Sequence, residues 1–422
     1  MRRVQKFSFH YLGFFDDKAS SHLWPTHPTT VRSPCNGFRT PTRPRDNDRC
    51  LYMDCHLPTS SESSGTMVQT KAFTWGEVAT NDPSLLRVAV VGAGYWGPNL
   101  IRNFYDTPGA TVTQVADLSQ DRLASIGRRY PSVSLSTDYK EVLRDPSVDA
   151  VCLAVPVSLH YPLALEALRA GKHVWVEKPL TLHSDEAKEL TEEADRRGLV
   201  LMVDHTFVYT PAVRRIRESI DAGELGALYY YDSVRVNLGL YQHDVNVLWD
   251  LGIHDVSVID YLVPFQPISV TASGASHVGK GNSESIAYVT VNFAENFLAH
   301  FHVNWLAPVK IRLMTVCGSE KMIVYDDNLS DTKIRLYDRG ITVSGSAAAR
   351  KRLQVDYRAG DMHAPKLDQA EALQTAAKHF VDCIVNEKRP TTDGEAGGRA
   401  VAILEAAQRS LNCRGVEERI IW

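Results

Sequence analysis

The stretch LLRVAVVGAGYWGPNLIRNFY, residues 85–105, decides the fold of this chain. An apolar run of strand length, LLRVAVVG, leads into a glycine-rich turn, and the turn leads into a helical pattern, PNLIRNFY. A G-x-G-x-x-G pattern alone is a weak signal. Here it lies between a strand and a helix, which is the context that a dinucleotide-binding turn requires. The stretch therefore predicts the first βα unit of a Rossmann domain.

Each glycine of this turn has a separate predicted task. Gly92 allows the tight turn, Gly94 lets the backbone approach a pyrophosphate, and Gly97 lets the helix pack close to the strand. Tyr95 and Trp96 complete the predicted cofactor-binding turn. The N-terminus of the following helix then offers free N–H groups and a partial positive charge to the phosphates.

The next predicted strand, TVTQVAD, ends at Asp117. This is the spacing expected for a carboxylate that accepts hydrogen bonds from the adenosine ribose hydroxyls. A 2′-phosphate would be repelled by the same charge, and Leu118 and Ser119, not an arginine, follow it. The sequence therefore predicts NAD as the cofactor in preference to NADP.

Strands and helices continue to alternate after this point. Helices are predicted over 119–130, 138–144, 160–170 and 184–197, and the strand candidates between them are DAVCLAV, HVWVEK and LVLMVD. Alternation of this kind implies parallel strand pairing with right-handed crossovers. Ligands of such a sheet lie beyond the carboxyl ends of its strands.

Three of these strand ends carry residues suited to a ligand site. They are Val155-Pro156, Glu177-Lys178-Pro179 and Asp204-His205. A charged strand end followed by proline can also be a solvated edge without function. Because these ends meet at the carboxyl edge of the predicted sheet, we expect Val155, Pro156, Glu177 and Lys178 to lie at the cofactor.

From about Phe207 the pattern changes. A helix over 211–222 leads into strands joined by short turns, which predicts one large, mostly antiparallel sheet with an open face. The strand candidates are ALYYYDSVRVN, ISVTASGASH, SIAYVTVNF, LAHFHVNWL, KIRLMTVCG, KMIVYDD and KIRLYD. The predicted fold class is therefore α/β, with a Rossmann domain over 85–206 and a substrate-binding and oligomerisation domain over 207–422.

One predicted helix, VLWDLGIHDVSVIDYL, interrupts these strands and carries Asp250 and His254 at i, i+4 spacing. This spacing puts both side chains on one face, where a carboxylate can fix the tautomer of an imidazole and raise its basicity. The alternative is an exposed helix pair, worth about a few tenths of a kcal/mol. The mostly apolar surroundings favour a buried, functional pair.

The composition excludes several function classes. A net charge of −4 provides no field that would recruit nucleic acid or an acidic membrane, and no apolar run approaches the roughly 18 residues that span a bilayer. The seven cysteines show no zinc or redox spacing, so no metal site is expected. Cys152, Cys317, Cys383 and Cys413 stand singly in apolar stretches, which suits a reducing cytoplasm.

Residues 1–84 differ from the rest of the chain. They carry little hydrophobic periodicity and contain PTHPTT, RTPTRPRDND and PTSSESSGT, so we expect a disordered extension. The basic and then aromatic start, MRRVQKFSFHYLGFF, leaves a targeting segment open as an alternative. A third interpretation is that the biological start is Met67.

Together these features resemble the glucose–fructose oxidoreductase, inositol dehydrogenase and rhizopine catabolism family (Gfo/Idh/MocA), from about Arg87 to the C-terminus. GAGYWG matches the family's glycine fingerprint, residues 177–179 match its E-K-P motif, and Asp250 to His254 match its D-x-x-x-H motif. The resemblance implies that Lys178 contacts the substrate, that the peptide bond after it is often cis, and that His254 carries the proton.

Four further stretches are similar to bacterial enzymes that act on nucleotide-linked sugars. They are GYWGPNL, NLGLYQHDVNVLWDLGIHD, NWLAPVKIR and DGEAGGRAVAILEAAQRSL. The similarity implies a UDP-N-acetyl-glucosaminuronate 3-dehydrogenase or a nucleotide-sugar 3-ketoreductase of cell-surface polysaccharide or glycoside biosynthesis. Lys310 and Arg312 are then candidates for the substrate's diphosphate, with a charged exposed strand edge as the alternative.

The predicted reaction transfers a hydride between NAD and a secondary alcohol or ketone. His254 moves the proton, Lys178 polarises the oxygen, and Asp250 orients His254. Inositol or a free hexose stays open as the substrate. The alternative from another functional class is a non-catalytic regulator that binds a dinucleotide. The intact proton-transfer residues argue against this alternative. The open sheet face predicts a homodimer or homotetramer.

Overall fold

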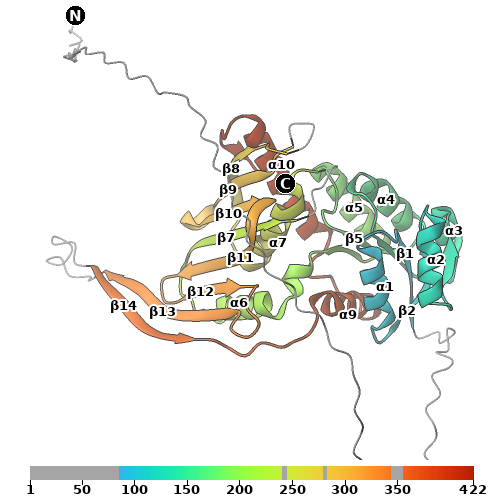
Figure 1. Cartoon of the computed structure of the whole chain (residues 1–422), viewed down its shortest axis with the longest axis horizontal. Coiled ribbons are helices and arrows are strands. Elements are labelled where there is room, and N and C mark those ends of the chain that lie inside the picture. Colours follow the sequence, from blue (N-terminus) through green and yellow to red (C-terminus); the bar gives the residue numbers. More distant parts are fainter. Residues whose placement is uncertain (1–84, 240–244, 279–282, 344–354) are drawn as a thin grey trace, which may run out of the picture. The chain divides into compact units, whose positions relative to one another are not determined.

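The computed structural model describes residues 85–239, 245–278, 283–343 and 355–422, and the predicted extension lies outside them. Within these residues the chain forms a six-stranded sheet and a nine-stranded sheet with helices (Figure 1). All pairings in the first sheet are parallel, and those in the second are antiparallel except one. The predicted α/β fold class is therefore confirmed.

The first sheet alternates with helices along the chain, as predicted. Its elements are β1 Leu86–Val91, α1 Gly97–Tyr105, β2 Ala110–Ala116, α2 Gln120–Arg129, β3 Ser134–Ser136, α3 Tyr139–Arg144, β4 Ala150–Leu153, α4 His160–Arg169, β5 His173–Glu177, α5 Ser184–Arg197 and β6 Leu201–Asp204. The strand order is β3-β2-β1-β4-β5-β6. The order reverses between β1 and β4, and a ligand crevice lies at such a point in open α/β sheets.

Local signals explain where several of these helices begin and end. The hydroxyl of Ser119 and the carboxylate of Asp138 accept hydrogen bonds from backbone N–H groups in the first turns of α2 and α3. Helix α5 ends at Gly198, whose φ of 66° suits glycine. In the described part of the chain no side chain caps α1, but Pro98 has no N–H and the Asn99 N–H donates to the Trp96 carbonyl (2.9 Å), so few of its first backbone groups remain for an anion.

The second sheet follows from residue 228 onward. The elements after β6 are α6 Pro211–Asp221, β7 Leu228–Leu238, α7 Ile253–Leu262, β8 Pro267–Ala275, β9 Ile286–Phe293, β10 Leu298–Asn304, β11 Leu306–Gly318, β12 Met322–Asp326, β13 Ile334–Val343, β14 Val355–His363, α9 Ala372–Val385, α10 Gly394–Asn412 and β15 Glu418–Arg419. The strand order is β14-β13-β12-β11-β7-β10-β9-β8-β15, and β7 pairs with β10 in parallel. The sequence predicted β7 to β13 but neither of the last two strands.

Helix α9 packs on the first sheet, although it lies within the segment expected to form the second domain. The Phe380 ring lies 6.0 Å from the Phe104 ring of α1 and 5.6 Å from the Trp175 ring of β5, in edge-to-face arrangements. All three rings are fully buried. The chain therefore returns to the Rossmann core after it has completed most of the second sheet.

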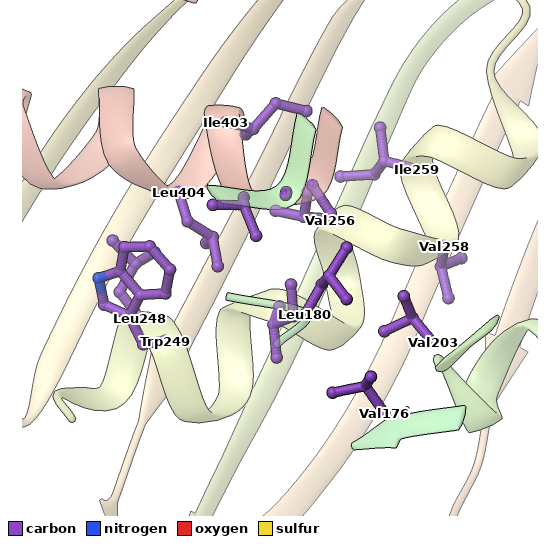
Figure 2. Packing of buried hydrophobic residues seen from close by; sticks show 14 of the residues in the cluster. Val176, Leu180, Val203, Leu248, Trp249, Val256, Val258, Ile259, Ile403 and Leu404 are labelled. Carbon is purple, nitrogen blue, oxygen red and sulfur yellow. The ribbon is translucent and has the colours of Figure 1, made fainter. Parts of the chain in front are cut away.

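A shared hydrophobic core joins the carboxyl ends of β5 and β6 to helices of the second half (Figure 2). Its members include Val176, Leu180, Val203, Leu248, Trp249, Val256, Val258, Ile259, Ile403 and Leu404. Because protein interiors are close-packed, this core holds the end of β5 and the start of α7 in one relative position. Among the described helices, none has both the length and the apolar character needed to cross a membrane.

Candidate active site

The glycine-rich turn has the shape that a dinucleotide backbone needs. Gly92 has φ 94°, and a Cβ there would overlap the carbonyl oxygen of Ala154, so the ends of β1 and β4 are in contact. A Cβ at Gly97 would overlap the carbonyl oxygen of Gly92, which shows how closely α1 packs on the turn. The space around Gly94 is open. Among the described residues beyond its chain neighbours, a Cβ at Gly94 would meet just the Arg122 guanidinium within 4 Å, at 3.8 Å. The turn is therefore open where a pyrophosphate would approach the α1 N-terminus.

The other predicted residues of this region surround the turn. The side chains of Tyr95 and Trp96 are exposed, and their rings meet edge to face with centroids 5.6 Å apart. The partly buried Val155 lies beside Gly92, and Pro156 is exposed at the end of β4. The structure thus brings these four side chains to the same edge of the sheet as the glycines.

Asp117 lies at the end of β2 and holds the turn from the other side. Its Oδ2 accepts a hydrogen bond from the backbone N–H of Ala93 (2.7 Å), and its Oδ1 accepts one from the N–H of Ser119 (2.7 Å). The Arg122 guanidinium lies 3.5 Å from Oδ2. The sequence did not predict the contact between Arg122 and Asp117. Arg122 lies in the first turn of α2, and the direction of its side chain depends on how that helix packs beside the end of β2.

Lys178 connects the end of β5 with the helix that carries the D-x-x-x-H motif. Its Nζ donates a hydrogen bond to the backbone carbonyl of Asp250 (2.9 Å) and lies 3.3 Å from the Asp250 carboxylate. The Trp305 indole N–H donates to the other carboxylate oxygen (3.0 Å). The two charged side chains are only 13% and 15% exposed, which excludes a solvated strand end. The Lys178–Pro179 peptide bond is cis, as the resemblance implied.

The predicted hydrogen bond between Asp250 and His254 is not observed. In the described part of the chain the Asp250 carboxylate accepts from Lys178 and Trp305, and it makes no hydrogen bond to the imidazole. A cationic donor makes a stronger hydrogen bond to a carboxylate than a neutral imidazole does. In addition, residues 248–252 form a π turn, so the i, i+4 geometry of a regular α-helix does not hold there.

His254 instead lies among aromatic and cationic groups. Its ring is 4.8 Å from the Phe207 ring, and its Nδ1 is buried without a hydrogen-bond partner in the described residues. Burial lowers the pKa of His254 well below its usual value, and the positive charges of Lys178, Arg235 and Arg312 lower it further. The imidazole is therefore neutral at neutral pH and able to accept a proton.

The two predicted substrate-binding cations on β11 differ in position. The Arg312 guanidinium lies 5.5 Å from the Phe207 ring centroid and 3.3 Å from the Asp327 carboxylate. Lys310 is exposed, and among the described residues its side chain makes no hydrogen bond or ion pair with this cluster. Arg312 therefore belongs to the surroundings of His254, and Lys310 does not.

Sequence reasoning did not identify Phe207 and Arg235 as site residues. The Arg235 guanidinium lies 4.3 Å from the Phe207 ring centroid and pairs with the buried Asp255 carboxylate at 2.8 Å. A signal for Arg235 was available, because its predicted strand alternates and Arg235 occupies the same face as the buried Tyr231 and Ser233. A charged residue on the inward face of a strand needs a partner, because an unpaired buried charge is costly.

Two protein-family models match this chain. The model for the oxidoreductase family with an NAD-binding Rossmann fold matches residues 86–205, and the GFO/IDH/MocA C-terminal domain matches residues 213–324. The chain belongs to the Gfo/Idh/MocA family. This Gfo/Idh/MocA protein is therefore an NAD(P)-dependent oxidoreductase, as its glycine turn and E-K-P motif predicted.

Several relatives of this Gfo/Idh/MocA protein have been described. It is 32% identical to scyllo-inositol 2-dehydrogenase (NAD(+)) of Bacillus subtilis (strain 168), over 45% of this chain and 57% of that enzyme. It is 28% identical to UDP-N-acetylglucosamine 3-dehydrogenase of Acidithiobacillus ferrooxidans, over 75% of this chain and 94% of that enzyme. A crystal structure of a protein described as an oxidoreductase from Magnetospirillum magnetotacticum MS-1 is 31% identical, with a TM-score of 0.66, and covers 76% of this chain and 99% of that protein. The alignment thus spans little more than half of the inositol enzyme.

Proposed function

We propose that the protein is an NAD-dependent dehydrogenase or ketoreductase that acts on a secondary alcohol or ketone of a nucleotide-linked sugar. The observation that supports this most strongly is the contact of Lys178 with Asp250 at the carboxyl end of β5, near enough to the buried His254 for the lysine's charge to lower the histidine pKa. When bound, NAD supplies the acceptor or donor of the hydride. The residues of this chain then have to hold the carbinol and move its proton.

The three side chains divide this work. Oxidation requires a base for the hydroxyl proton, and the neutral His254 serves as that base. The Lys178 ammonium donates a hydrogen bond to the same oxygen and stabilises the negative charge that develops there. Asp250 positions Lys178, not His254, because its carboxylate and its carbonyl both contact the ammonium group. In the reductive direction the same groups return the proton to the oxygen.

The proposal of a nucleotide-linked sugar as substrate is supported by one relative and by one side chain. UDP-N-acetylglucosamine 3-dehydrogenase aligns over most of its length, and Arg312 offers a positive charge beside the proposed base. The second candidate is an inositol or a free hexose, which the 32% identity to scyllo-inositol 2-dehydrogenase favours. Membership of an oxidoreductase family removes the support for a non-catalytic regulator.

A ligand screen distinguishes the two substrate classes. With NAD present, UDP- and dTDP-sugars should raise the melting temperature more than scyllo- and myo-inositol do, and the stabilising sugars should then be tested for NADH formation. Turnover of an inositol, with no turnover of any nucleotide sugar, would contradict the nucleotide-sugar proposal and leave the dehydrogenase chemistry intact.

Arg312→Ala should weaken the binding of a nucleotide-linked substrate. The change removes a cation beside His254, so we expect KM for the nucleotide sugar to rise about tenfold, equivalent to about 1.4 kcal/mol. Lys333→Ala is the matched control, because Lys333 pairs with the same Asp327 carboxylate at 3.0 Å. If both variants raise KM equally, the ion pairs at Asp327 maintain the fold of this region and Arg312 has no contact with substrate.

Asp117→Ala should weaken NAD binding and relax the preference for NAD over NADP. The carboxylate orders the glycine turn and would lie at the adenosine end of a bound cofactor, and its removal would leave Arg122 free to attract a 2′-phosphate. Fluorescence titration with NADH and NADPH measures both effects. Our interpretation of β2 is wrong if the unmodified protein binds NADPH tenfold more tightly than NADH.

We also propose that the protein forms a homo-oligomer through the open face of the second sheet. Tyr230, Tyr288 and Leu298 are more than 40% exposed on adjacent strands of that face. Such a patch usually packs against another protein surface. We expect light scattering to show a dimer or a tetramer.

A cytoplasmic location is proposed from the cysteines. In the described residues Cys152, Cys317, Cys383 and Cys413 are unpaired thiols, and the first three are buried. Unpaired thiols are typical of a reducing compartment.

A further inference from the structure

The carboxyl ends of β5 and β6 bring two acidic side chains together. Glu177 is the last residue of β5, Asp204 is the last residue of β6, and the two are paired directly across the parallel strands. Neighbouring strands lie about 4.8 Å apart, and directly paired residues project from the same face. Glu177 is 8% exposed and Asp204 is 2% exposed. Two carboxyl groups therefore share one water-poor space at the edge where the NAD site lies.

A hydrogen bond between these two carboxyl groups would need a proton. Glu177 and Asp204 are paired across β5 and β6, and two carboxyl groups can form a hydrogen bond only when one of them is protonated. Asp204 Oδ1 also accepts a hydrogen bond from the Thr206 hydroxyl (2.7 Å). Glu177 Oε1 is buried and has no hydrogen-bond partner among the described residues.

The neighbouring groups do not provide enough positive charge for two carboxylates. Lys178 is the cation that acts on both acids in the described part of the chain, and Asp250 already pairs with it. The other titratable neighbours are neutral. Burial raises the pKa of Cys152 on β4, burial raises that of Tyr209, and burial lowers the pKa of His205 to about 3. Two ionised carboxylates at this place would repel each other with little compensation.

We propose that Glu177 and Asp204 share a single proton, and that gain or loss of this proton tunes the affinity of the nicotinamide site for NAD⁺ relative to NADH. Burial and the charge of Asp204 raise the pKa of Glu177 well above its usual range, and burial raises the pKa of Asp204 to about 6, in agreement with one shared proton. The inference rests on the NAD site of the proposed function.

The physical reason is the charge of the nicotinamide ring, which is positive in NAD⁺ and absent in NADH. A pair that has lost its proton carries two negative charges instead of one and attracts the cation more strongly. Loss of the proton should therefore favour NAD⁺. By linkage, NADH binding should take up more protons than NAD⁺ binding does.

The test compares the affinity of both cofactor forms across pH. In the unmodified protein the ratio of Kd for NADH to Kd for NAD⁺ should rise about tenfold as the pH is raised from neutral into alkaline solution and the pair loses its proton. Asp204→Asn keeps a hydrogen-bond donor for Glu177 and leaves one permanent negative charge, so the ratio should become independent of pH. Glu177→Gln should behave in the same way. Asp195→Asn, an equivalent change at an exposed site on α5, should leave the pH dependence as it was.

Infrared spectroscopy and titration of the unmodified protein keep the proposal testable if the variants do not fold. At neutral pH the unmodified protein should show the carbonyl band of a protonated carboxylic acid, and folded Asp204→Asn and Glu177→Gln proteins should lack it. No such band and a ratio that does not change with pH would overturn the shared proton and leave the proposed function intact. Failure to bind either form of NAD would overturn both.

Discussion

Lys178→Met should turn over about 10²–10³-fold more slowly than the unmodified protein, while its Kd for NAD stays within a few-fold. Methionine keeps the length of the side chain and removes the ammonium group that we place at the reacting oxygen. The measurement is kcat with the substrate found by the ligand screen, together with a titration of NADH fluorescence. Lys188→Met on the exposed face of α5 is the matched control and should be neutral.

A second variant separates catalysis from stability. Lys178→Met leaves the poorly exposed Asp250 carboxylate without its cation, so the melting temperature should fall. Adding Asp250→Asn removes that uncompensated charge and should restore much of the melting temperature without restoring turnover. Full recovery of activity in the double variant would show that Lys178 maintains the fold and does not contact the substrate.

His254→Ala should lose about 10²–10⁴-fold in kcat, because the base that takes the carbinol proton is removed. The pH profile gives the sharper readout. Burial and three nearby cations lower the pKa of His254, so the unmodified protein should stay active in the oxidative direction into mildly acidic solution. Its activity should then fall as the pH drops through that lowered pKa and His254 becomes protonated. The variant should lack this fall on the acid side.

The exposed His277 provides the control for this histidine, and His277→Ala should keep both the rate and the pH profile. Lys178→Met combined with His254→Ala should cost less than the product of the single effects, because both groups act on one oxygen. An unchanged acid limb in His254→Ala would assign the base to another group.

Most of the first sheet could be predicted because its signals are local. The run from β1 into α1, the glycines of the turn and the caps of α2 and α3 each depend on residues a few positions apart. The same holds for β7 to β13, where alternation and short turns define the strands. Helix α9 could not be placed in this way, since Phe380 reaches Phe104 across more than 270 residues.

The sequence predicted which residues form the candidate site, but it predicted only some of the contacts between them. The E-K-P and D-x-x-x-H motifs identified Lys178, Asp250 and His254 from the sequence. The partner of Asp250 was predicted incorrectly, because helical spacing relates it to His254 and gives no information on an ammonium group 72 residues away. Trp305, the second donor to Asp250, comes from a third segment of the chain.

The sequence by itself determined the α/β class, the NAD(P)-binding turn and the identity of the motif residues, since these follow from periodicity and spacing along the chain. The tertiary structure decided which of these groups are neighbours, which are buried and which are paired. Glu177 and Asp204 become neighbours only when β5 and β6 align in parallel, and His254 loses solvent only when Phe207 packs against it. Hydrogen bonding, burial and electrostatic interaction depend on distance in space, and strand pairing and core packing establish that distance between residues remote in sequence.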